Sequence, residues 1–155
     1  MKTEEKINLE LIRYYTMNSW NRSKAPAFNL KVYKVIPRDL QDKVFEQMEA
    51  EDFYAEINLL ISEFKEKHNF AWQAGFNGRS GGYLVLYKGE QDESGRIGVY
   101  PGKNIEVSEV PDDILESFRQ LAVDIVKNTI YRAKNCHIKE EKYTVSKTRK
   151  VICDN

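Results

Sequence analysis

The strongest constraint on the fold of this chain is a period-two pattern that leads into a glycine-rich loop. Alternate residues are aromatic or small and would share one face of a strand: Phe70, Trp72, Ala74 and Phe76. The loop 77–82 (Asn-Gly-Arg-Ser-Gly-Gly) separates this run from a second β-rich segment, Tyr83–Lys88. Two such runs around a short glycine-containing loop predict an antiparallel β-hairpin.

The segments before this hairpin predict helices and one further strand. Apolar residues at helical spacing indicate a helix over about Glu4–Met17. The β-branched and aromatic residues of Asn29–Ile36 predict a strand, which Pro37 stops. Residues 38–67 predict two helices with a joint near Glu49–Asp52. One face of the second helix would carry Phe53, Ile57, Leu60 and Phe64.

The segments after the hairpin complete the set of elements. A polar loop, Gly89–Gly95, leads to a short third strand at Arg96–Tyr100. Pro111 and two aspartates then open a long helix, because proline suits a first turn and acids suit the helix dipole. Its buried stripe would be Ile114, Phe118, Leu121, Ile125 and Val126. A last β-like segment, Lys142–Lys147, precedes a basic tail at about 147–155.

These elements predict a single α+β domain over residues 1–155, a length that suits one domain. A small antiparallel β-meander would pack against an N-terminal helix, a central acidic helical region and a long C-terminal helix. No apolar run approaches the roughly 20 residues needed to span a bilayer, and no signal-peptide pattern opens the chain. We therefore expect a cytoplasmic protein without a membrane partner.

Metal and cofactor chemistry has little support in the sequence. The chain has two cysteines and two histidines, and only Cys136 and His137 are adjacent. A structural zinc site needs four ligands, and Cys153 alone does not supply the missing ones. His68 ends the acidic helical region, where a cap or surface role is the simpler interpretation. No Walker lysine signature or G-x-G-x-x-G motif is present, so we expect neither a metal nor a cofactor.

The net charge of zero conceals strong local charges. Residues 13–38 carry +6 with no acid, residues 39–66 carry −7, and residues 142–152 carry +4 with no acid. Fields of this kind act locally, because salt screens them over about 10 Å. The acidic region could imitate a nucleic-acid backbone in a basic groove of a protein, and the basic segments could bind nucleic acid. The simpler alternative is that folding places opposite charges side by side.

The glycine-rich loop also matches the nucleophile elbow G-x-S-x-G at residues 78–82. Asp124 and His137 follow Ser80 in the order of a serine hydrolase. An elbow needs a strand that leads into a helix, whereas here a predicted strand follows the loop. Serine hydrolysis is accordingly the third of three functional hypotheses.

The same loop can be interpreted as an anion cradle. Backbone N–H groups of Gly78, Gly81 and Gly82 could converge on a phosphate or carboxylate, and Arg79 could add a bidentate contact. Aromatic residues on the flanking strands could stack a base. The simpler alternative is a hairpin turn whose aromatic residues face the core, which is the better interpretation for Trp72 and Phe76.

Three motifs resemble those of one protein family. They are Tyr-Thr-Met-Asn-Ser-Trp-Asn-Arg-Ser at 15–23, Trp-Gln-Ala-Gly-Phe-Asn-Gly-Arg-Ser-Gly-Gly-Tyr-Leu-Val-Leu-Tyr at 72–87, and Ser-Lys-Thr-Arg-Lys-Val at 146–151. The chain is similar along nearly its whole length to small phage and integrative-element proteins of Firmicutes without an assigned function. Longer members of that family carry a cysteine-rich insertion, whereas Lys88–Gly102 is short here and has no cysteine.

The resemblance implies an accessory protein of a phage or mobile element. We expect it to antagonise a host defence system by binding rather than catalysis, either as an anti-CRISPR-type effector inhibitor or as a nucleotide-signal sponge. Nucleic-acid binding in phage replication or regulation is the alternative, and a homo-oligomer is compatible with either. The predicted binding residues come from two loops that would converge: Trp20, Asn21, Arg22, Asn77, Gly78, Arg79, Ser80, Gly81, Gly82 and Tyr83. The predicted acidic surface comprises Glu49, Glu51, Asp52 and Glu56.

Overall fold

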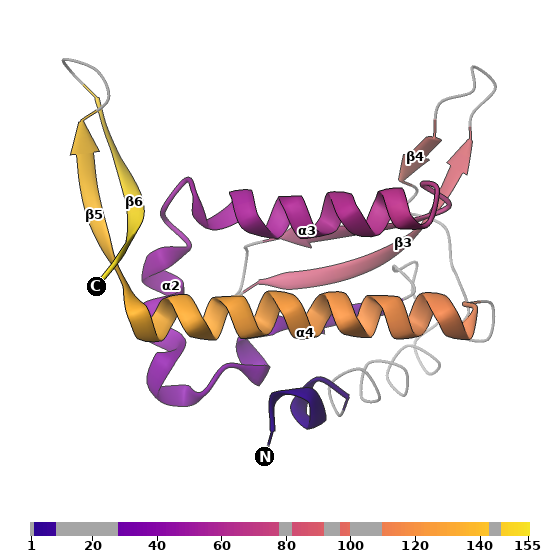
Figure 1. Ribbon diagram of the computed structural model, residues 1–155, viewed down its shortest axis with the longest axis horizontal. Helices are drawn as coiled ribbons and strands as arrows, with labels where there is room; N and C mark the ends of the chain where they lie inside the picture. The colour runs from indigo at the N-terminus through magenta and orange to yellow at the C-terminus, as the bar shows by residue number, and fades with distance from the viewer. Residues whose placement is uncertain (1, 9–27, 78–81, 92–96, 100–109, 143–146) are drawn as a thin grey trace.

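A computed structural model describes residues 2–8, 28–77, 82–91, 97–99, 110–142 and 147–155. Two long helices, α3 (Phe53–Lys67) and α4 (Asp112–Asn135), lie side by side over one face of a β-sheet (Figure 1). A separate two-stranded hairpin projects from the C-terminal end of α4. The predicted α+β class is therefore confirmed.

The main sheet contains the predicted hairpin. Strand β2 (Trp72–Asn77) pairs antiparallel with β3 (Tyr83–Gln91), and their register places Asn77 opposite Tyr83. Trp72 and Ala74 are buried, and Phe76 packs against the core, as predicted. Phe70 was wrongly placed on the same strand. It is 43% exposed and has a φ of 60°, because it lies in the turn that follows α3, where its N–H donates to the Lys65 carbonyl.

The strand predicted at Asn29–Ile36 is shorter in the structure. Strand β1 (Phe28–Lys31) pairs antiparallel with the first half of β3 and ends where Lys31 meets Tyr83, the first residue of β3. The chain continues as the 3₁₀ helix η1 (Val32–Val35). Val32 and Val35 are both buried in it, because a spacing of three places them on one side of a 3₁₀ turn.

Strand β3 is longer than the predicted Tyr83–Lys88. It extends to Gln91, into the segment predicted to be a polar loop, because β4 (Ile97–Val99) pairs with it from Gly89 onward. The predicted third strand of the meander is thus present. Its glycines and polar residues gain regular backbone hydrogen bonds from the pairing, which sequence preferences do not register.

The helical predictions hold with small changes. Residues 3–8 are helical and bury Ile7, while the rest of the predicted N-terminal helix lies outside the described residues. The 3₁₀ helix η2 (Arg38–Leu40) leads into α2 (Gln41–Gln47), and the joint before α3 falls as predicted. Ile61 is buried on α3, and Leu60 only partly. The stripe predicted for α4 is buried in full, and Pro111 precedes the helix.

The C-terminal prediction was wrong in its bounds. Strands β5 (Cys136–Lys142) and β6 (Thr148–Asp154) form the projecting hairpin, so the predicted basic tail is itself a strand. Ile138 and Ile152 pack against the core and anchor it. The other residues of the two strands are mostly polar, and their sequence therefore gave little indication of a hairpin.

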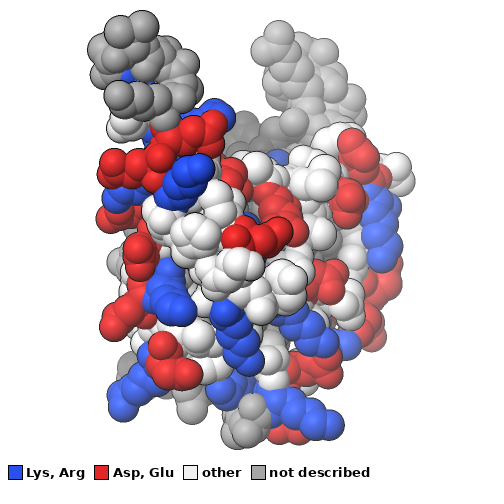
Figure 2. Space-filling model, turned by 60° about the vertical axis from the view of Figure 1, so that its left-hand side comes forward, with Lys and Arg blue, Asp and Glu red and all other residues white. Residues whose placement is uncertain are grey.

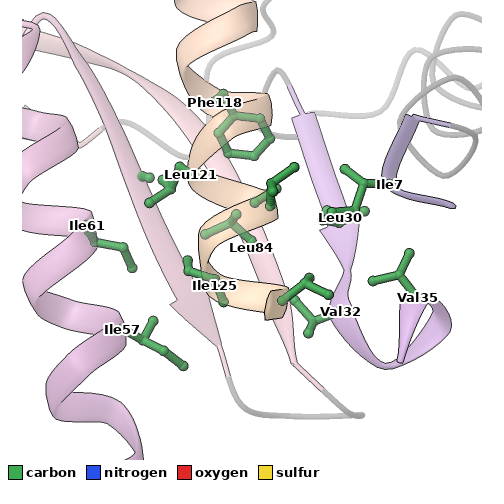
Figure 3. Close-up of a cluster of buried hydrophobic side chains, with 14 of the residues drawn as sticks. Ile7, Leu30, Val32, Val35, Ile57, Ile61, Leu84, Phe118, Leu121 and Ile125 are labelled. Atoms are coloured by element: carbon green, nitrogen blue, oxygen red, sulfur yellow. The ribbon is translucent and has the colours of Figure 1, made fainter. Parts of the chain in front are cut away.

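One hydrophobic core lies between the two long helices and the sheet. Side chains from both helices, β1, β3 and residues 3–8 converge there (Figure 3), including Ile7, Leu30, Ile57, Leu84, Phe118 and Ile125. Among the described residues, no helix has both the length and the apolar character of a membrane span.

Candidate functional site

The corner between α2 and α3 binds the C-terminal hairpin through its acidic residues. Glu49 forms an ion pair with Lys150 of β6. The Asp52 carboxylate accepts two hydrogen bonds from the Ile152 backbone N–H, at 3.0 and 3.2 Å. Three of the four residues predicted to form an acidic surface therefore have partners within the chain, since Glu56 pairs with Arg132 at 3.3 Å.

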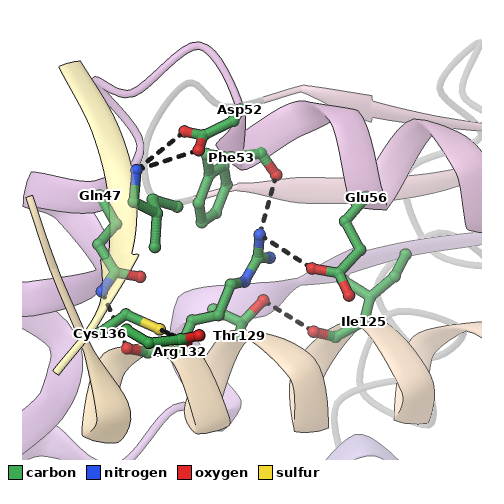
Figure 4. A network of polar contacts seen from close by, with 10 residues as sticks. Gln47, Asp52, Phe53, Glu56, Ile125, Thr129, Arg132 and Cys136 are labelled. Atoms are coloured by element: carbon green, nitrogen blue, oxygen red, sulfur yellow. Dashed lines mark hydrogen bonds and ion pairs between the residues drawn. The ribbon is translucent and has the colours of Figure 1, made fainter. Parts of the chain in front are cut away.

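Arg132 is the most unusual residue of this region. It is only 8% exposed, and this burial lowers the pKa of its guanidinium. The negative charge of Glu56 has the opposite, smaller effect on that pKa. Its Nη1 donates to the Phe53 carbonyl at 3.3 Å, and its guanidinium carbon lies 5.0 Å from the centre of the Phe53 ring. Figure 4 shows the side chain rising from α4 toward the first turn of α3. Nε and Nη2 are buried and have no hydrogen-bond partner among the described residues.

A second buried polar group lies beside Arg132. Gln47 of α2 donates from Nε2 to the Arg132 carbonyl at 3.0 Å, while its Oε1 is buried and has no partner in the described part of the chain. An unsatisfied buried donor or acceptor costs about 1–3 kcal/mol, so most native interiors avoid such groups. Among the described residues, the buried polar side-chain atoms without a hydrogen bond therefore all lie around the last turn of α4.

An open hollow of about 320 Å³ adjoins Arg132, between α3, α4 and the hairpin. Its lining residues are Asp52, Glu56, Asn128, Tyr131, Arg132, Cys136, Ile152 and Asp154. With the acids ionised and Arg132 protonated, these side chains carry a formal charge of −2. Pockets for small ligands begin at about 300 Å³, so the hollow is large enough for one.

The cysteine that lines the hollow, Cys136, is not activated as a nucleophile. The Cys136 thiol is buried and donates to Asp154 Oδ1 at 3.5 Å, and both burial and that contact raise its pKa. It is therefore a protonated thiol near neutral pH and a poor nucleophile. The neighbouring His137 contacts Asn155 Oδ1 at 2.8 Å. Within the described ranges, no three His, Cys, Asp or Glu residues are grouped so as to hold a metal ion.

The predicted loop site falls mostly outside the described residues. Those positions are Trp20, Asn21, Arg22, Gly78, Arg79, Ser80 and Gly81, and the side chain of Asn77 is also outside them. Gly82 and Tyr83 are described. Gly82 has a φ of +93° and its carbonyl accepts from the Val32 N–H at 2.8 Å, so its role in the structure is conformational. The predicted convergence of the two loops stays a prediction.

Tyr83 belongs to a cluster next to that loop. Lys31 Nζ lies 4.5 Å from the centre of the Tyr33 ring and 5.4 Å from that of Tyr83. Hydrogen bonding to the two tyrosines raises the pKa of Lys31. This cation thus sits on two aromatic faces, where cation–π attraction holds it.

The arrangement required for a serine hydrolase is not supported around residues 78–82. Strand β3, not a helix, follows the loop. Asp124 lies eleven residues before the end of α4 and His137 lies beyond that end, so the helix alone separates them by roughly 16 Å. Asp124 accepts a hydrogen bond from Gln120 at 3.0 Å instead.

Sequence reasoning missed two polar groups that have partners inside the fold. His68 Nε2 contacts Ser117 Oγ at 2.7 Å and ties the end of α3 to the first turns of α4. This spacing suits a nucleophile and its base, but the hollow lies roughly 16 Å away along α4, so we assign the pair a structural role. Arg132 continues the apolar stripe of α4 after Val126 and Thr129 at a spacing of three. A basic residue at a position of the buried stripe of α4 is the sequence signal that could have identified Arg132.

The chain matches no protein-family model, no curated protein and no solved structure.

Proposed function

We propose that this protein is a non-enzymatic accessory protein of a phage or mobile element that antagonises a host defence system by binding one of its effector proteins. The observation that carries the proposal is the outer face of α3. The exposed residues from 51 to 67 include five acids and one base, Lys67 at the end of α3: Glu51, Asp52, Ala55, Glu56, Asn58, Leu59, Ser62, Glu63, Glu66 and Lys67. Their spacing places Glu56, Leu59, Glu63 and Glu66 on one side of the helix. We call these four residues the α3 outer face.

The α3 outer face combines charge with an apolar anchor. Leu59 is 60% exposed between two glutamates of this face. Protein interfaces typically contain an apolar centre with a polar rim, and acidic charge accelerates association with a basic groove. The β5–β6 and β3–β4 hairpins stand beyond opposite ends of α3 (Figure 1), so a partner that reaches this helix would lie between them.

The charges favour a protein partner over nucleic acid or a nucleotide signal. Glutamates on α3 would repel phosphates, and so would the net negative hollow. Two bases of the C-terminal strand have acidic partners, Lys150 with Glu49 and Arg149 with Glu141. In the view of Figure 2, acidic and basic side chains alternate over most of the surface, and a group of acidic ones lies near its centre.

Phage plating on a host with a nucleic-acid-targeting defence system tests the proposal. Expression of the wild-type chain should restore plating, and the purified chain should co-elute with an effector subunit of that system. Glu63→Lys/Glu66→Lys and Leu59→Ala should abolish both effects. Glu49 and Asp52 are unsuitable for charge reversal because they hold the hairpin, and Glu56 is unsuitable because it pairs with the buried Arg132 of α4.

A matched control keeps the experiment specific. Glu5 and Asp42 are exposed and lie on other helices, so Glu5→Lys/Asp42→Lys introduces the same change of charge elsewhere. Equal rescue by both double variants would exclude the α3 outer face. Co-elution with nucleic acid that disappears at higher salt would favour the alternative, a nucleic-acid-binding protein.

A further inference from the structure

The outer face of the C-terminal hairpin pairs a cysteine with a histidine. The register of β5 and β6 places His137 directly opposite Cys153, and opposed residues of an antiparallel pair share a face. The next opposed pair, Ile138 and Ile152, packs against the core. Because adjacent residues of a strand point to opposite faces, the His137–Cys153 pair points away from the core. We propose that this pair is half of a Cys₂His₂ zinc site, and that a second copy of this chain supplies the other half.

Both side chains of the pair can meet an ion from solvent. His137 is exposed, and Cys153 is a partly exposed free thiol. The β-carbons of directly opposed residues lie about 4.5–5.5 Å apart, which allows a thiolate and an imidazole to bind one ion at about 2.3 and 2.0 Å. Cys136 differs, because it is buried on the opposite face and donates to Asp154. The ligand is therefore Cys153 and not Cys136.

Asn155 holds the imidazole in the form that binds a metal. His137 Nδ1 lies 2.8 Å from Asn155 Oδ1, an amide oxygen that can only accept a hydrogen bond. Nδ1 therefore carries the proton of the neutral ring, and the lone pair for a metal is on Nε2. Asn155 is itself anchored, since its backbone N–H donates to the Asn135 carbonyl at 2.8 Å. Histidines that bind metals typically have such a hydrogen bond on the other ring nitrogen.

The ligand types select zinc among the common metal ions. Thiolate and imidazole suit Zn²⁺, whereas Mg²⁺ and Ca²⁺ prefer carboxylate and carbonyl oxygens. Each thiol releases its proton to the solvent as it binds the ion. Two thiolates then cancel the charge of Zn²⁺, so the completed site is neutral. Lys139, which shares the face of His137, therefore does not oppose it.

A second copy is needed because one chain supplies two of the four ligands of a structural zinc. Within the described residues, no third His, Cys, Asp or Glu joins this pair in a metal-binding group. A two-fold axis through the ion brings the same pair from a second copy and completes the tetrahedron. The hairpin lies beyond the C-terminal end of α4, at one end of the molecule (Figure 1), where a second copy can approach it.

Titration of the full, reduced chain with Zn²⁺ tests the proposal. Analytical ultracentrifugation should show a monomer without metal and a dimer with Zn²⁺, at one ion per two chains. Co²⁺ in place of Zn²⁺ should give the intense visible bands of a tetrahedral ion and a thiolate-to-metal band in the near ultraviolet. Cys153→Ser and His137→Ala should each abolish the zinc-dependent dimer, while the metal-free proteins unfold at the wild-type temperature.

The other cysteine and the other histidine of the chain provide matched controls. Cys136→Ser and His68→Gln remove the same residue types and should keep both the dimer and the Co²⁺ bands. Asn155→Ala should weaken zinc binding at least about tenfold, because the imidazole loses its orienting partner. Asn155→Asp should retain the wild-type affinity, since a carboxylate also accepts from Nδ1.

Three results would overturn the zinc site. They are one Zn²⁺ bound per monomer, a dimer that persists in Cys153→Ser, and Co²⁺ spectra without a thiolate band. The site does not rest on the function proposed above, whose test residues Glu63 and Glu66 lie on α3. Glu63→Lys/Glu66→Lys should therefore dimerise with Zn²⁺ as the wild type does, even where it no longer binds an effector.

Discussion

The Ile152 backbone N–H donates to both carboxylate oxygens of Asp52, a residue 100 positions earlier in the chain. This contact fixes the last strand against the N-terminal end of α3, and the Glu49–Lys150 ion pair reinforces it. Two residues of β6, Ile152 and Asp154, also line the hollow. Glu49 and Asp52 therefore bind the C-terminal hairpin of their own chain.

Loss of the Asp52 carboxylate should loosen the hairpin without unfolding the protein. We expect Asp52→Ala to lower the free energy of unfolding by roughly 1 kcal/mol, since the contact is exposed and a typical net hydrogen bond is worth about that much. Hydrogen exchange at the Ile152 amide should accelerate, while amides in the centre of α4 stay protected. The neighbouring Glu51→Ala is the control and should leave the Ile152 amide unchanged.

Gly82→Ala should destabilise the main sheet. A β-carbon at Gly82 would approach Phe76 Cζ to 2.8 Å, and the residue has a φ of +93° that side chains rarely adopt. We expect a loss of about 1–3 kcal/mol in a denaturant titration. Phe76→Leu in the same chain should recover the part of the loss due to the clash. A Gly82→Ala protein as stable as the wild type would contradict the conformational role of this glycine.

Protonation of His68 should destabilise the fold. Burial, helped by Lys67, lowers the pKa of His68 in the folded state, against a smaller opposite effect of Asp113. A histidine with a lowered folded pKa contributes full stability above its unfolded pKa of about 6.5. That contribution is lost as the pH falls through the folded value. The stability difference between wild type and His68→Gln, measured by urea titration from pH 7.5 downward, should shift toward the variant at lower pH. A constant difference would show that His68 does not titrate in this range.

Two substitutions of Arg132 should have very different effects on stability. Arg132→Met keeps most of the buried volume and removes the unpartnered donors, so we expect a free energy of unfolding within about 1 kcal/mol of the wild type. Arg132→Ala also leaves a cavity and should cost about 2–3 kcal/mol. Thermal and urea unfolding of both variants give the comparison. A large loss in Arg132→Met would mean that its contacts with Glu56 and Phe53 outweigh the cost of burying the charge.

The sequence allowed the larger elements to be predicted, because their signals are periodic. The buried stripe of α4 repeats at helical spacing, and Trp72 and Ala74 alternate at strand spacing, so burial and pattern agree. The hairpin β5–β6 could not be predicted in this way. Its strands are mostly polar and depend on contacts such as Ile152 to Asp52, which no local pattern encodes.

The candidate site was partly anticipated, but the partners of its residues within the chain were not. The charge of residues 39–66 identified Glu49, Asp52 and Glu56 as important, whereas their partners lie on α4 and β6. Arg132 was overlooked because a long polar side chain within a helix is normally exposed. Its environment is set by the packing of α2, α3 and the hairpin around α4, which only the three-dimensional arrangement shows.

The position of β6 in the chain determines when the hollow can form during synthesis. Domains begin to fold while the ribosome is still adding residues, and contacts distant in sequence form late. The core of α3, α4 and the main sheet uses residues that emerge before the hairpin is complete. The carboxylates of Asp52 and Glu49 therefore stay solvated, without their β6 partners, until residues 150–152 have left the ribosome. A chain that ends before Lys150 would keep the residues of α3, α4 and the main sheet but would lack Ile152 and Asp154, which line the hollow.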